Sequence, residues 1–152
     1  IPTDFTMTAW VKLVAAGTTR THVIFSTTNA TAFRFVVQET SGVFKIQGIR
    51  GATTDEKVEF TLVNPTTVWN HVAVTFSNTN NNMNLYVNGD LKATLNGTTD
   101  ITSHNLYVAG NNSSGGFKGY LDGITLHHDV LDRETIQNFY LFDKNIITTT
   151  KY

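Results

Sequence analysis

Short runs in which apolar and polar residues alternate recur along the whole chain, separated by turn residues. From Phe5 to Leu13 every second residue is apolar, so one face of an extended strand would be apolar. The run from Trp69 to Phe76 is apolar on both faces, which is typical of a central strand covered on both sides. Asn88 and Gly89 stand between two alternating runs and predict a tight hairpin. Further strand-like runs cover residues 22–26, 33–38, 43–49, 58–63, 106–110 and 117–128.

One segment near the C-terminus has helical spacing instead. Ile136, Phe139 and Tyr140 share one helix face, and Asp132 is placed to cap the first turn. Leu131 and Ile136 stand where a hydrophobic staple would close over that cap. A single short helix after a series of strands is not the alternation that builds a parallel sheet. The pattern therefore predicts an all-β antiparallel sandwich with one short C-terminal helical turn.

Composition agrees with this fold class and argues against some classes of binding partner. The chain has 152 residues, the size of one domain, and 40% of them are hydrophobic, so a sizeable core is expected. Threonine favours strands, asparagine favours turns, and both are abundant. The net charge is −1 and there is no basic run, which argues against a nucleic-acid partner. No stretch is apolar enough to span a bilayer, so we expect no membrane insertion.

The order of the segments resembles a known family. The blocks FTMTAWVKL, WNHVAVTF, LYVNGDL and FKGYLDGITLHHDVLDRETIQNFY are similar to the laminin-G-like branch of the concanavalin A-like lectin/glucanase superfamily. Members carry an F-T-[IM]-[ST]-x-W strand, a W-x-H-[VIL]-A-[VL]-T strand and an L-Y-V-[DN]-G hairpin. They close with a G-x-[IL]-D-x-[VI] strand and an L-[ST]-x-x-E-I helical turn. All five blocks occur here in order over residues 3–140, and the resemblance implies a jelly-roll sandwich of two antiparallel sheets.

The resemblance also raises a question about the ends of the chain. Family members usually carry a strand ahead of the first block, where this sequence has only Ile1 and Pro2. We expect that strand either upstream or replaced by the segment after Phe142. The predicted domain covers residues 1–142, and residues 143–152 form a tail that is an extra strand or the start of a connector. Because the sequence begins without methionine, we expect one domain of a longer protein.

The sequence gives little support for a catalytic site or for a metal site built from histidines. Asp55 and Glu59 could share a strand face, but the family's E-x-D-x-x-E arrangement of catalytic acids is absent, which favours a solvated strand edge. His127 and His128 are adjacent, so they would point to opposite faces of a strand and not to one metal ion. His71 matches a structural position of the family. We therefore predict that the protein is not an enzyme.

Asp122 is the acidic residue that most needs an explanation. It stands between apolar residues, where an unpaired carboxylate would be costly to bury. A backbone hydrogen bond would explain it without a ligand. The alternative is a calcium ion, which prefers carboxylate and carbonyl oxygens, and the resemblance implies calcium because many relatives bind it. We name Asp122 as the candidate metal ligand and Ca²⁺ as the candidate cofactor.

Ligand binding is expected in the polar loops and on free aromatic rings. Asparagine amides both donate and accept hydrogen bonds, as sugar hydroxyls require, and aromatic rings can stack on a sugar. Trp10 and Trp69 match positions that the family places in the core, so tyrosines are better candidates for stacking on a sugar. Plain solvated loops and packing roles remain the alternative for each residue. The candidate ligand-binding residues are Asn80, Asn81, Asn82, Asn111, Asn112, Tyr107 and Tyr120.

The resemblance and these polar loops together suggest a function. We expect a non-catalytic binding module of a larger secreted or cell-surface protein that recognises carbohydrate or glycoconjugate. The alternative is a protein-recognition or spacer domain of an adhesin or multidomain ectoprotein, which the lack of an obvious aromatic cluster favours. A divergent hydrolase is a third possibility, and the missing acidic motif argues against it. In the first two cases the partners are a glycan or a surface protein and other domains of the parent chain, in an extracellular setting.

Overall fold

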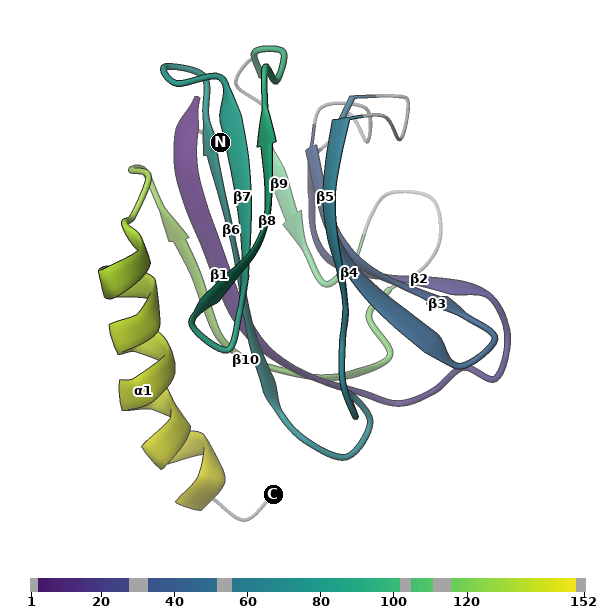
Figure 1. Ribbon diagram of the computed structural model, residues 1–152. Helices are drawn as coiled ribbons and strands as arrows, with labels where there is room; N and C mark the ends of the chain where they lie inside the picture. The colour runs from purple at the N-terminus through teal and green to yellow at the C-terminus, as the bar shows by residue number, and fades with distance from the viewer. Residues whose placement is uncertain (1–2, 28–32, 52–55, 102–104, 111–115, 150–152) are drawn as a thin grey trace.

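The computed structural model is a sandwich of two five-stranded antiparallel sheets (Figure 1). It describes residues 3–27, 33–51, 56–101, 105–110 and 116–149, with side chains in the last range described through Lys144. The predicted jelly-roll fold class is confirmed. Sheet A has the order β10 (Gly119–His127), β1 (Asp4–Leu13), β6 (Asn70–Ser77), β7 (Asn82–Val87) and β8 (Asp90–Asn96). Sheet B has the order β5 (Glu56–Thr61), β4 (Val43–Arg50), β3 (Phe33–Thr40), β2 (Arg20–Thr27) and β9 (Leu106–Val108).

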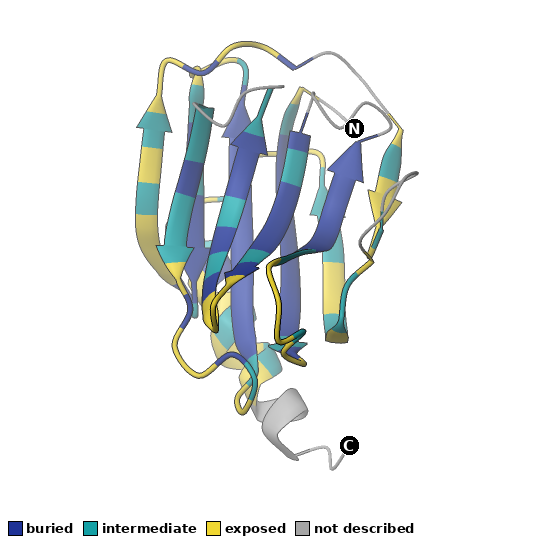
Figure 2. Cartoon of the chain, turned by 90° about the vertical axis from the view of Figure 1, so that its right-hand side faces the viewer, coloured by how far each residue is buried: buried dark blue, intermediate teal, exposed yellow. Residues whose placement is uncertain are grey.

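A cluster of aromatic side chains packs between the two sheets in the core. The ring of Phe5 in β1 meets Phe33 of β3 edge-on at 5.0 Å and stacks on Phe76 of β6 at 5.6 Å. All three side chains are completely buried. Figure 2 shows that buried residues fill the central strands, while exposed ones alternate along the outer strands and loops. The alternation seen in the sequence therefore marks which residues enter the core.

The outer face of sheet A is covered by the helix α1 (Arg133–Thr149) (Figure 1). Asp132 caps it as predicted, because its Oδ1 accepts a 2.8 Å hydrogen bond from the amide of Thr135. Ile136 is fully buried against Ala73 and Tyr86, with Leu131 packed on the same cluster, so the predicted staple is confirmed. Among the described residues, no helix has both the length and the apolar character that crossing a membrane requires.

The helix is longer than the single turn that we predicted. It continues to Thr149, so residues 143–149 are helical and do not form the extra strand that was one option for the tail. The physical reason is that no glycine or proline follows Tyr140 to end the helix before that point. Stacking of the Tyr140 ring on Trp10, at 5.7 Å, holds this second half of the helix against sheet A.

The N-terminal strand lies inside sheet A and not at its edge. β1 pairs with β6 on one side and with β10 on the other, in a register that places Thr6 opposite His127 and Leu13 opposite Gly119. Within the described ranges there is no strand ahead of Asp4 and none after His127. The edges of the two described sheets are instead formed by β10 and β8, and by β5 and β9.

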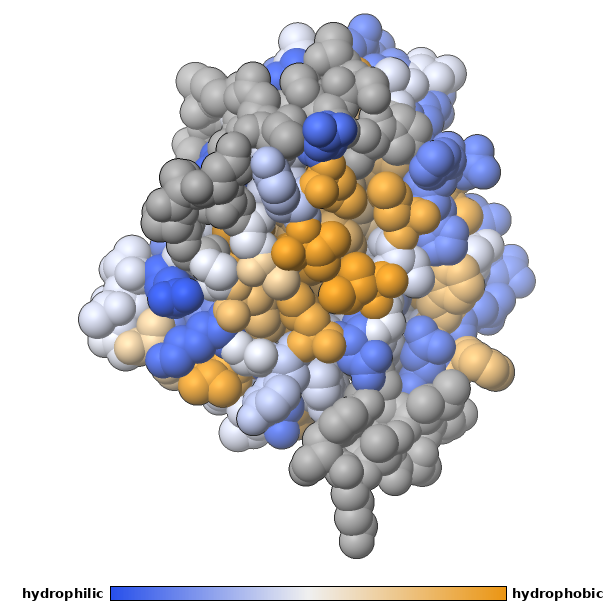
Figure 3. All heavy atoms as spheres, turned by 180° about the vertical axis from the view of Figure 1, so that it is seen from behind, coloured by the Kyte–Doolittle hydropathy of each residue, from blue (hydrophilic) through white to orange (hydrophobic). Residues whose placement is uncertain are grey.

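An apolar surface lies where the edge strands β9 and β10 leave the sandwich open. Seen from behind, apolar side chains gather near the centre of the molecule (Figure 3). Val108 of β9 and Ile124 of β10 are among the exposed large apolar residues. Leu121 and Leu126 of β10 are partly buried against the main core. The side of the sandwich is therefore less completely closed here than along its central strands.

The predicted hairpin at Asn88 and Gly89 is confirmed, and it also organises the strand beside it. Both residues have positive φ angles, 53° and 82°, as a type I′ turn requires. The Asn88 side chain accepts a hydrogen bond from the backbone amide of His71 and donates one to the Asn70 side chain.

Trp69, which the resemblance assigns to the core, is only half buried. The reason is that β6 begins one residue later, so Trp69 lies at its open end beside Tyr120.

Gly89 and Gly97 make a matched pair for testing this turn. An alanine at either site must adopt a left-handed backbone, but at Gly89 its Cβ would also lie 3.2 Å from the Tyr140 ring and 3.3 Å from Gln137 of α1, whereas nothing surrounds Gly97. We expect Gly89→Ala to lower the free energy of unfolding by about 2 kcal/mol and Gly97→Ala by about 1 kcal/mol. Urea denaturation of both variants would measure this, and equal losses would contradict the contact with the helix.

His71 lies beneath the helix and is almost completely buried. Its ring is 5.3 Å from that of Trp10 and 6.3 Å from that of Tyr140. Burial lowers the pKa of His71 from 6.5 to about 4, so the imidazole is neutral at physiological pH. Neither His71 Nδ1 nor Trp10 Nε1 has a hydrogen-bond partner among the described residues. The structural role that the resemblance implies for His71 agrees with this position.

The lowered pKa of His71 predicts how stability depends on pH. Below pH 6.5 the unfolded chain binds a proton at His71 that the folded chain does not bind until about pH 4. The contribution of this residue is therefore present above pH 6.5 and is lost as the pH falls toward 4, by about 3 kcal/mol in total. We expect a His71→Phe variant to lose less stability than the wild type between pH 7 and pH 5 in urea denaturation. Parallel curves would show that His71 does not cause the dependence.

Candidate functional site

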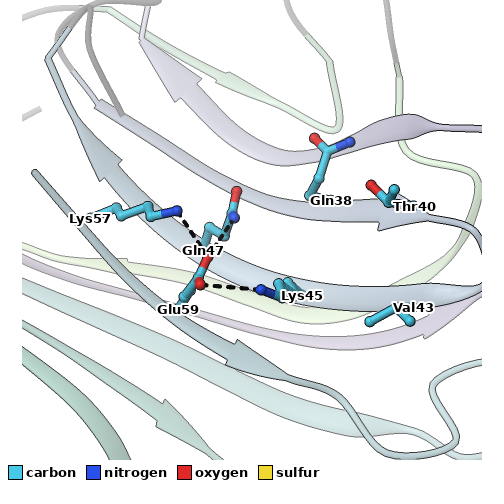
Figure 4. Close-up of a pocket in the computed structure, with 7 residues that line it drawn as sticks. All are labelled: Gln38, Thr40, Val43, Lys45, Gln47, Lys57 and Glu59. Atoms are coloured by element: carbon cyan, nitrogen blue, oxygen red, sulfur yellow. Dashed lines mark hydrogen bonds and ion pairs between the residues drawn. The ribbon is translucent and has the colours of Figure 1, made fainter. Parts of the chain in front are cut away.

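The outer face of sheet B carries a polar cleft of about 440 Å³ (Figure 4). Each strand of the sheet contributes alternate residues to this face, since their neighbours in sequence point into the core. The antiparallel register then sets Gln47 opposite Glu59 and Gln38 opposite Lys45. The residues that line the cleft are Gln38 and Thr40 of β3, Val43, Lys45 and Gln47 of β4, and Lys57 and Glu59 of β5.

Glu59 is the centre of the hydrogen bonds in the cleft. Its carboxylate accepts a 2.9 Å bond from Gln47 Nε2 and lies 3.1 Å from Lys57 Nζ and 3.3 Å from Lys45 Nζ (Figure 4). The hydrogen bond from Gln47 and the two ammonium groups lower the pKa of Glu59, so it is ionised at neutral pH. Three donors therefore hold one carboxylate acceptor in a fixed position on an otherwise open sheet face.

The remaining residues of the cleft add further polar groups and one apolar contact. Gln38 Oε1 accepts a 2.6 Å hydrogen bond from Thr21 Oγ1, and its Nε2 group points toward the backbone carbonyl of Glu39 at 3.3 Å. The side chain of Val43 is 48% exposed beside Thr40. A surface that combines a carboxylate acceptor, several N–H donors and a small apolar contact suits a polyhydroxylated ligand.

A second depression, of about 540 Å³, lies at the rim of the sandwich. It forms where the turn between β6 and β7 meets the segment that follows β8 and the end of β4. Arg50 fixes one wall, because its Nε donates a 3.1 Å hydrogen bond to the carbonyl of Thr99 and its Nη2 donates to that of Asp100. The depression is lined by Arg50, Asn81, Gly97, Thr98, Thr99 and Asp100.

The predicted loop Asn80–Asn82 is part of a tightly organised turn. Asp4 accepts hydrogen bonds from the backbone amides of Asn78, at 2.8 Å, and Thr79, at 3.3 Å. Asn80 and Asn81 are exposed and Asn82 is half buried at the start of β7. The structure brings Asn81 to the rim depression, while Asn80 and Asn82 are not among its lining residues. Asn111 and Asn112 lie outside the described residues.

The two predicted tyrosines lie on different surfaces. Tyr107 is in β9 at the edge of sheet B and is 38% exposed, whereas Tyr120 is in β10 of sheet A and is 57% exposed. Tyr107 is paired with Ser26 of sheet B, and Tyr120 with Lys12 of sheet A. Each side chain points out from its own sheet, so the two rings do not form one stacking platform. Their roles in binding stay predictions. Two further rings belong to packed clusters: Tyr86 is buried under α1, and Phe117 packs partly on the core.

Asp122 has a backbone partner of the kind expected for a structural carboxylate. It is half buried in β10, and its Oδ1 accepts a 2.7 Å hydrogen bond from the amide of Gly123. The described residues contain no group of three or more histidine, cysteine, aspartate or glutamate side chains that could hold a metal ion. A calcium ion at Asp122 would therefore need carbonyl oxygens or water among its ligands, and it stays a prediction.

Thermal unfolding in calcium and in a chelator would test the metal site. If Asp122 is a ligand, calcium at about a hundred times its Kd stabilises the fold by about 2.7 kcal/mol, a shift of several degrees. An Asp122→Asn variant would lose that shift, whereas Asp129→Asn, an exposed control beyond the end of β10, would keep it. Identical melting temperatures with and without calcium would exclude a calcium site of useful affinity.

Sequence reasoning missed the polar cleft, although the chain holds a signal for it. Polar residues recur at alternate positions in three successive strands, at Gln38 and Thr40, at Lys45 and Gln47, and at Lys57 and Glu59. Such alternation indicates a solvent-facing sheet surface. What the sequence does not show is the register, which determines that Gln47 and both lysines meet at Glu59. Histidines 127 and 128 do not contribute, since His127 stacks on Phe139 of the helix and His128 is exposed.

Comparison with known proteins agrees with this architecture. A sequence model of a laminin G family, described as Concanavalin A-like lectin/glucanases superfamily, matches residues 2–137. No curated protein matches the sequence significantly.

Several solved structures share the fold. The native heptameric SAP-like pentraxin from Limulus polyphemus has a TM-score of 0.71 at 14% identity, over 91% of this chain and 70% of the pentraxin chain. Domain 4 of AbnA, an extracellular GH43 arabinanase from Geobacillus stearothermophilus, in complex with arabinotriose, has a TM-score of 0.69 at 17% identity. The match covers 92% of this chain and 68% of the AbnA domain chain. The CBM40 of a Ruminococcus gnavus IT-sialidase, bound to α2,3-sialyllactose, has a TM-score of 0.61 at 19% identity. The match covers 91% of this chain and 83% of the CBM40 chain. Identities this low show a common fold.

Proposed function

Because this chain belongs to a laminin G family of the concanavalin A-like lectin/glucanase superfamily, we propose that it is a non-catalytic carbohydrate-binding module. In this proposal it serves a larger secreted or cell-surface protein, and its ligand is a glycan or glycoconjugate. The observation that carries the proposal is the polar cleft on sheet B, where three donors fix the carboxylate of Glu59. Fold alone does not define function in this superfamily, so the argument rests on that site.

The groups in the cleft match the chemistry of a sugar. Each lysine ammonium has three N–H groups and directs one of them toward Glu59, so others are available for hydroxyl oxygens. Glu59 can accept hydrogen bonds from hydroxyl groups, and charge-assisted bonds of this kind are among the stronger ones. The exposed side chain of Val43 offers an apolar contact for the C–H face of a sugar ring. Two ammonium groups and one carboxylate leave the cleft with a net charge of +1, which also permits acidic sugars.

Proteins of the same fold support the choice of ligand class. Domain 4 of AbnA is described in complex with arabinotriose and the CBM40 with α2,3-sialyllactose. Both are carbohydrate complexes, one with a neutral and one with an acidic glycan. The likeness in fold is consistent with glycan binding by this chain, and the cleft supplies the local chemistry for it.

The cleft does not have the acid–base character of a glycosidase site. A retaining or inverting glycosidase needs one carboxyl with a raised pKa to protonate the leaving group. The neighbours of Glu59 lower its pKa instead. Asp55, its predicted partner, lies outside the described residues. We therefore propose binding without hydrolysis.

A glycan array with the isolated domain, run in calcium and in chelator, would test the proposal. For any glycan that binds, we expect Glu59→Gln to weaken the affinity at least about tenfold, because a charged acceptor is replaced and its lysine contacts are lost. Glu134→Gln, an exposed carboxylate on the opposite side of the protein, should leave affinity unchanged. Urea denaturation of both variants would confirm that they are folded.

Two results would count against this function. Silence of the wild-type domain across the array, in both calcium and chelator, would overturn carbohydrate binding. Binding that Glu59→Gln does not change would place the glycan outside the cleft and overturn the proposed site.

A protein-recognition role is the second candidate, and the apolar surface of β9 and β10 favours it. Val108 of β9 is 49% exposed and Ile124 of β10 is 39% exposed. Contiguous exposed apolar patches are typical of protein interfaces. This alternative predicts that a Val108→Ser, Ile124→Ser double variant loses a protein ligand while a cleft variant keeps it. The glycan proposal expects the reverse for a glycan ligand: the cleft variant loses it and the double variant keeps it.

A further inference from the structure

The imidazole of His71 and the indole of Trp10 lie side by side beneath the second half of α1. His71 is 1% exposed and Trp10 is 2% exposed. Tyr140 packs against both, because its ring stacks on Trp10 at 5.7 Å and lies 6.3 Å from His71. His71 Nδ1 and Trp10 Nε1 are buried without a hydrogen-bond partner among the described residues. A proton added at Nδ1 would therefore place a charged donor where the described residues offer it no acceptor.

The two halves of α1 are held on sheet A in different ways. At the start of the helix, the amide of Leu131 donates a 2.9 Å hydrogen bond to Thr6 Oγ1, and Ile136 is completely buried. In the second half, Tyr140 supplies the stacking contact, whereas Phe142 is 71% exposed. The sequence of the last turn contains no basic residue that would interact favourably with the helix dipole. The second half can therefore separate from the sheet while the first half stays docked.

Ionisable groups surround the His71 and Trp10 pair on four elements. They are Lys12 of β1, Tyr86 of β7, Asp122 and His127 of β10, and Tyr140, Asp143 and Lys144 of α1. The two aspartates and the two lysines balance in charge. Burial, and none of these groups, lowers the pKa of His71 from 6.5 to about 4. The imidazole is therefore kept neutral by its cover and not by a neighbouring charge.

We propose that the second half of α1, residues 140–149, is an acid-sensitive cover: protonation of His71 favours its release from sheet A and exposes the outer face around Trp10. Release returns the imidazole to water, so the proton binds the open form more tightly than the closed form. This inference does not depend on the function proposed for the cleft, which lies on the other sheet.

The pH window follows from the two pKa values of His71. Its pKa is 6.5 when the imidazole is open to water and about 4 when it is covered. Above pH 6.5 neither form binds the proton, and the cover is fully stable. As the pH falls toward 4, only the open form binds it, so the equilibrium constant for opening increases. Between pH 7.5 and pH 5 we expect an increase of about thirtyfold.

Hydrogen exchange of the ¹⁵N-labelled protein at pH 7.5 and pH 5, followed by NMR and corrected for the intrinsic rate at each pH, tests the proposal. We expect the amides of residues 140–149 to be less protected than those of β6 and to respond only weakly to low concentrations of urea, because the opening is local. Their protection should fall about thirtyfold between the two pH values.

Two histidine variants identify the group that responds to pH. His71→Phe should remove the decrease in protection of the helix. His127→Phe is the matched control, because His127 also lies under α1 and its ring stacks on Phe139 at 5.5 Å. This control should keep the thirtyfold decrease. A decrease that persists in His71→Phe, or that is lost only in His127→Phe, would overturn the assignment. Helix amides with the protection and the urea dependence of β6 would show that the helix opens only by global unfolding, and would also overturn it.

A measurement on the imidazole itself keeps the proposal testable if His71→Phe does not fold. NMR titration should give His71 a pKa of about 4 in the wild type. Tyr140→Ala should raise this pKa toward 6.5, because the variant removes the ring that packs over the imidazole. Phe142→Ala, an exposed control on the same helix, should leave it unchanged. The same pKa in all three proteins would show that α1 does not cover His71.

Discussion

The arrangement of this protein follows from the need to bury both faces of β6. Every residue of this strand is buried, so it needs a cover on each side. Sheet B covers the inner face, and the Phe5, Phe33 and Phe76 rings fill the space between the sheets. Helix α1 covers the outer face, where Ile136 packs on Ala73. The hairpin at Asn88 and Gly89 brings the chain close beneath that helix, and the cap at Asp132 starts it there.

Sheet B differs from sheet A because its outer face is largely uncovered, and the polar cleft lies on that face. Its inner face closes the core, but over much of β3, β4 and β5 its outer face carries polar residues, and α1, the helix of the described residues, lies on the other sheet. Residues that are far apart in the sequence, such as Gln47 and Glu59, become neighbours through strand register alone. A sheet whose other face is fixed by the core can vary its outer face without loss of the fold. This separation is a physical reason why one sandwich can carry many binding functions.

The polar cleft and the rim depression differ in how far their polar groups are already satisfied. In the cleft, the donors around Glu59 fix its position and keep it ionised, so a ligand exchanges or shares existing contacts. At the rim, Arg50 and Glu56 fix the backbone while the hydroxyl of Thr98 stays unsatisfied. Charge separates them further, since the lining of the cleft has a net charge of +1 and that of the rim depression is neutral.

The sequence by itself determined the fold class, most of the strands, the Asn88–Gly89 hairpin and the Asp132 cap. Each of these depends on local chemistry: side-chain alternation, a left-handed turn and a helix terminus. The tertiary structure decided the half burial of Trp69, the continuation of the helix through Thr149, and the placement of Tyr107 and Tyr120 on different sheets. It also decided that Lys45, Gln47 and Lys57 meet at Glu59 and that Thr98 is buried without a partner. These features depend on strand register and on which elements cover which face, and contacts between distant segments set both.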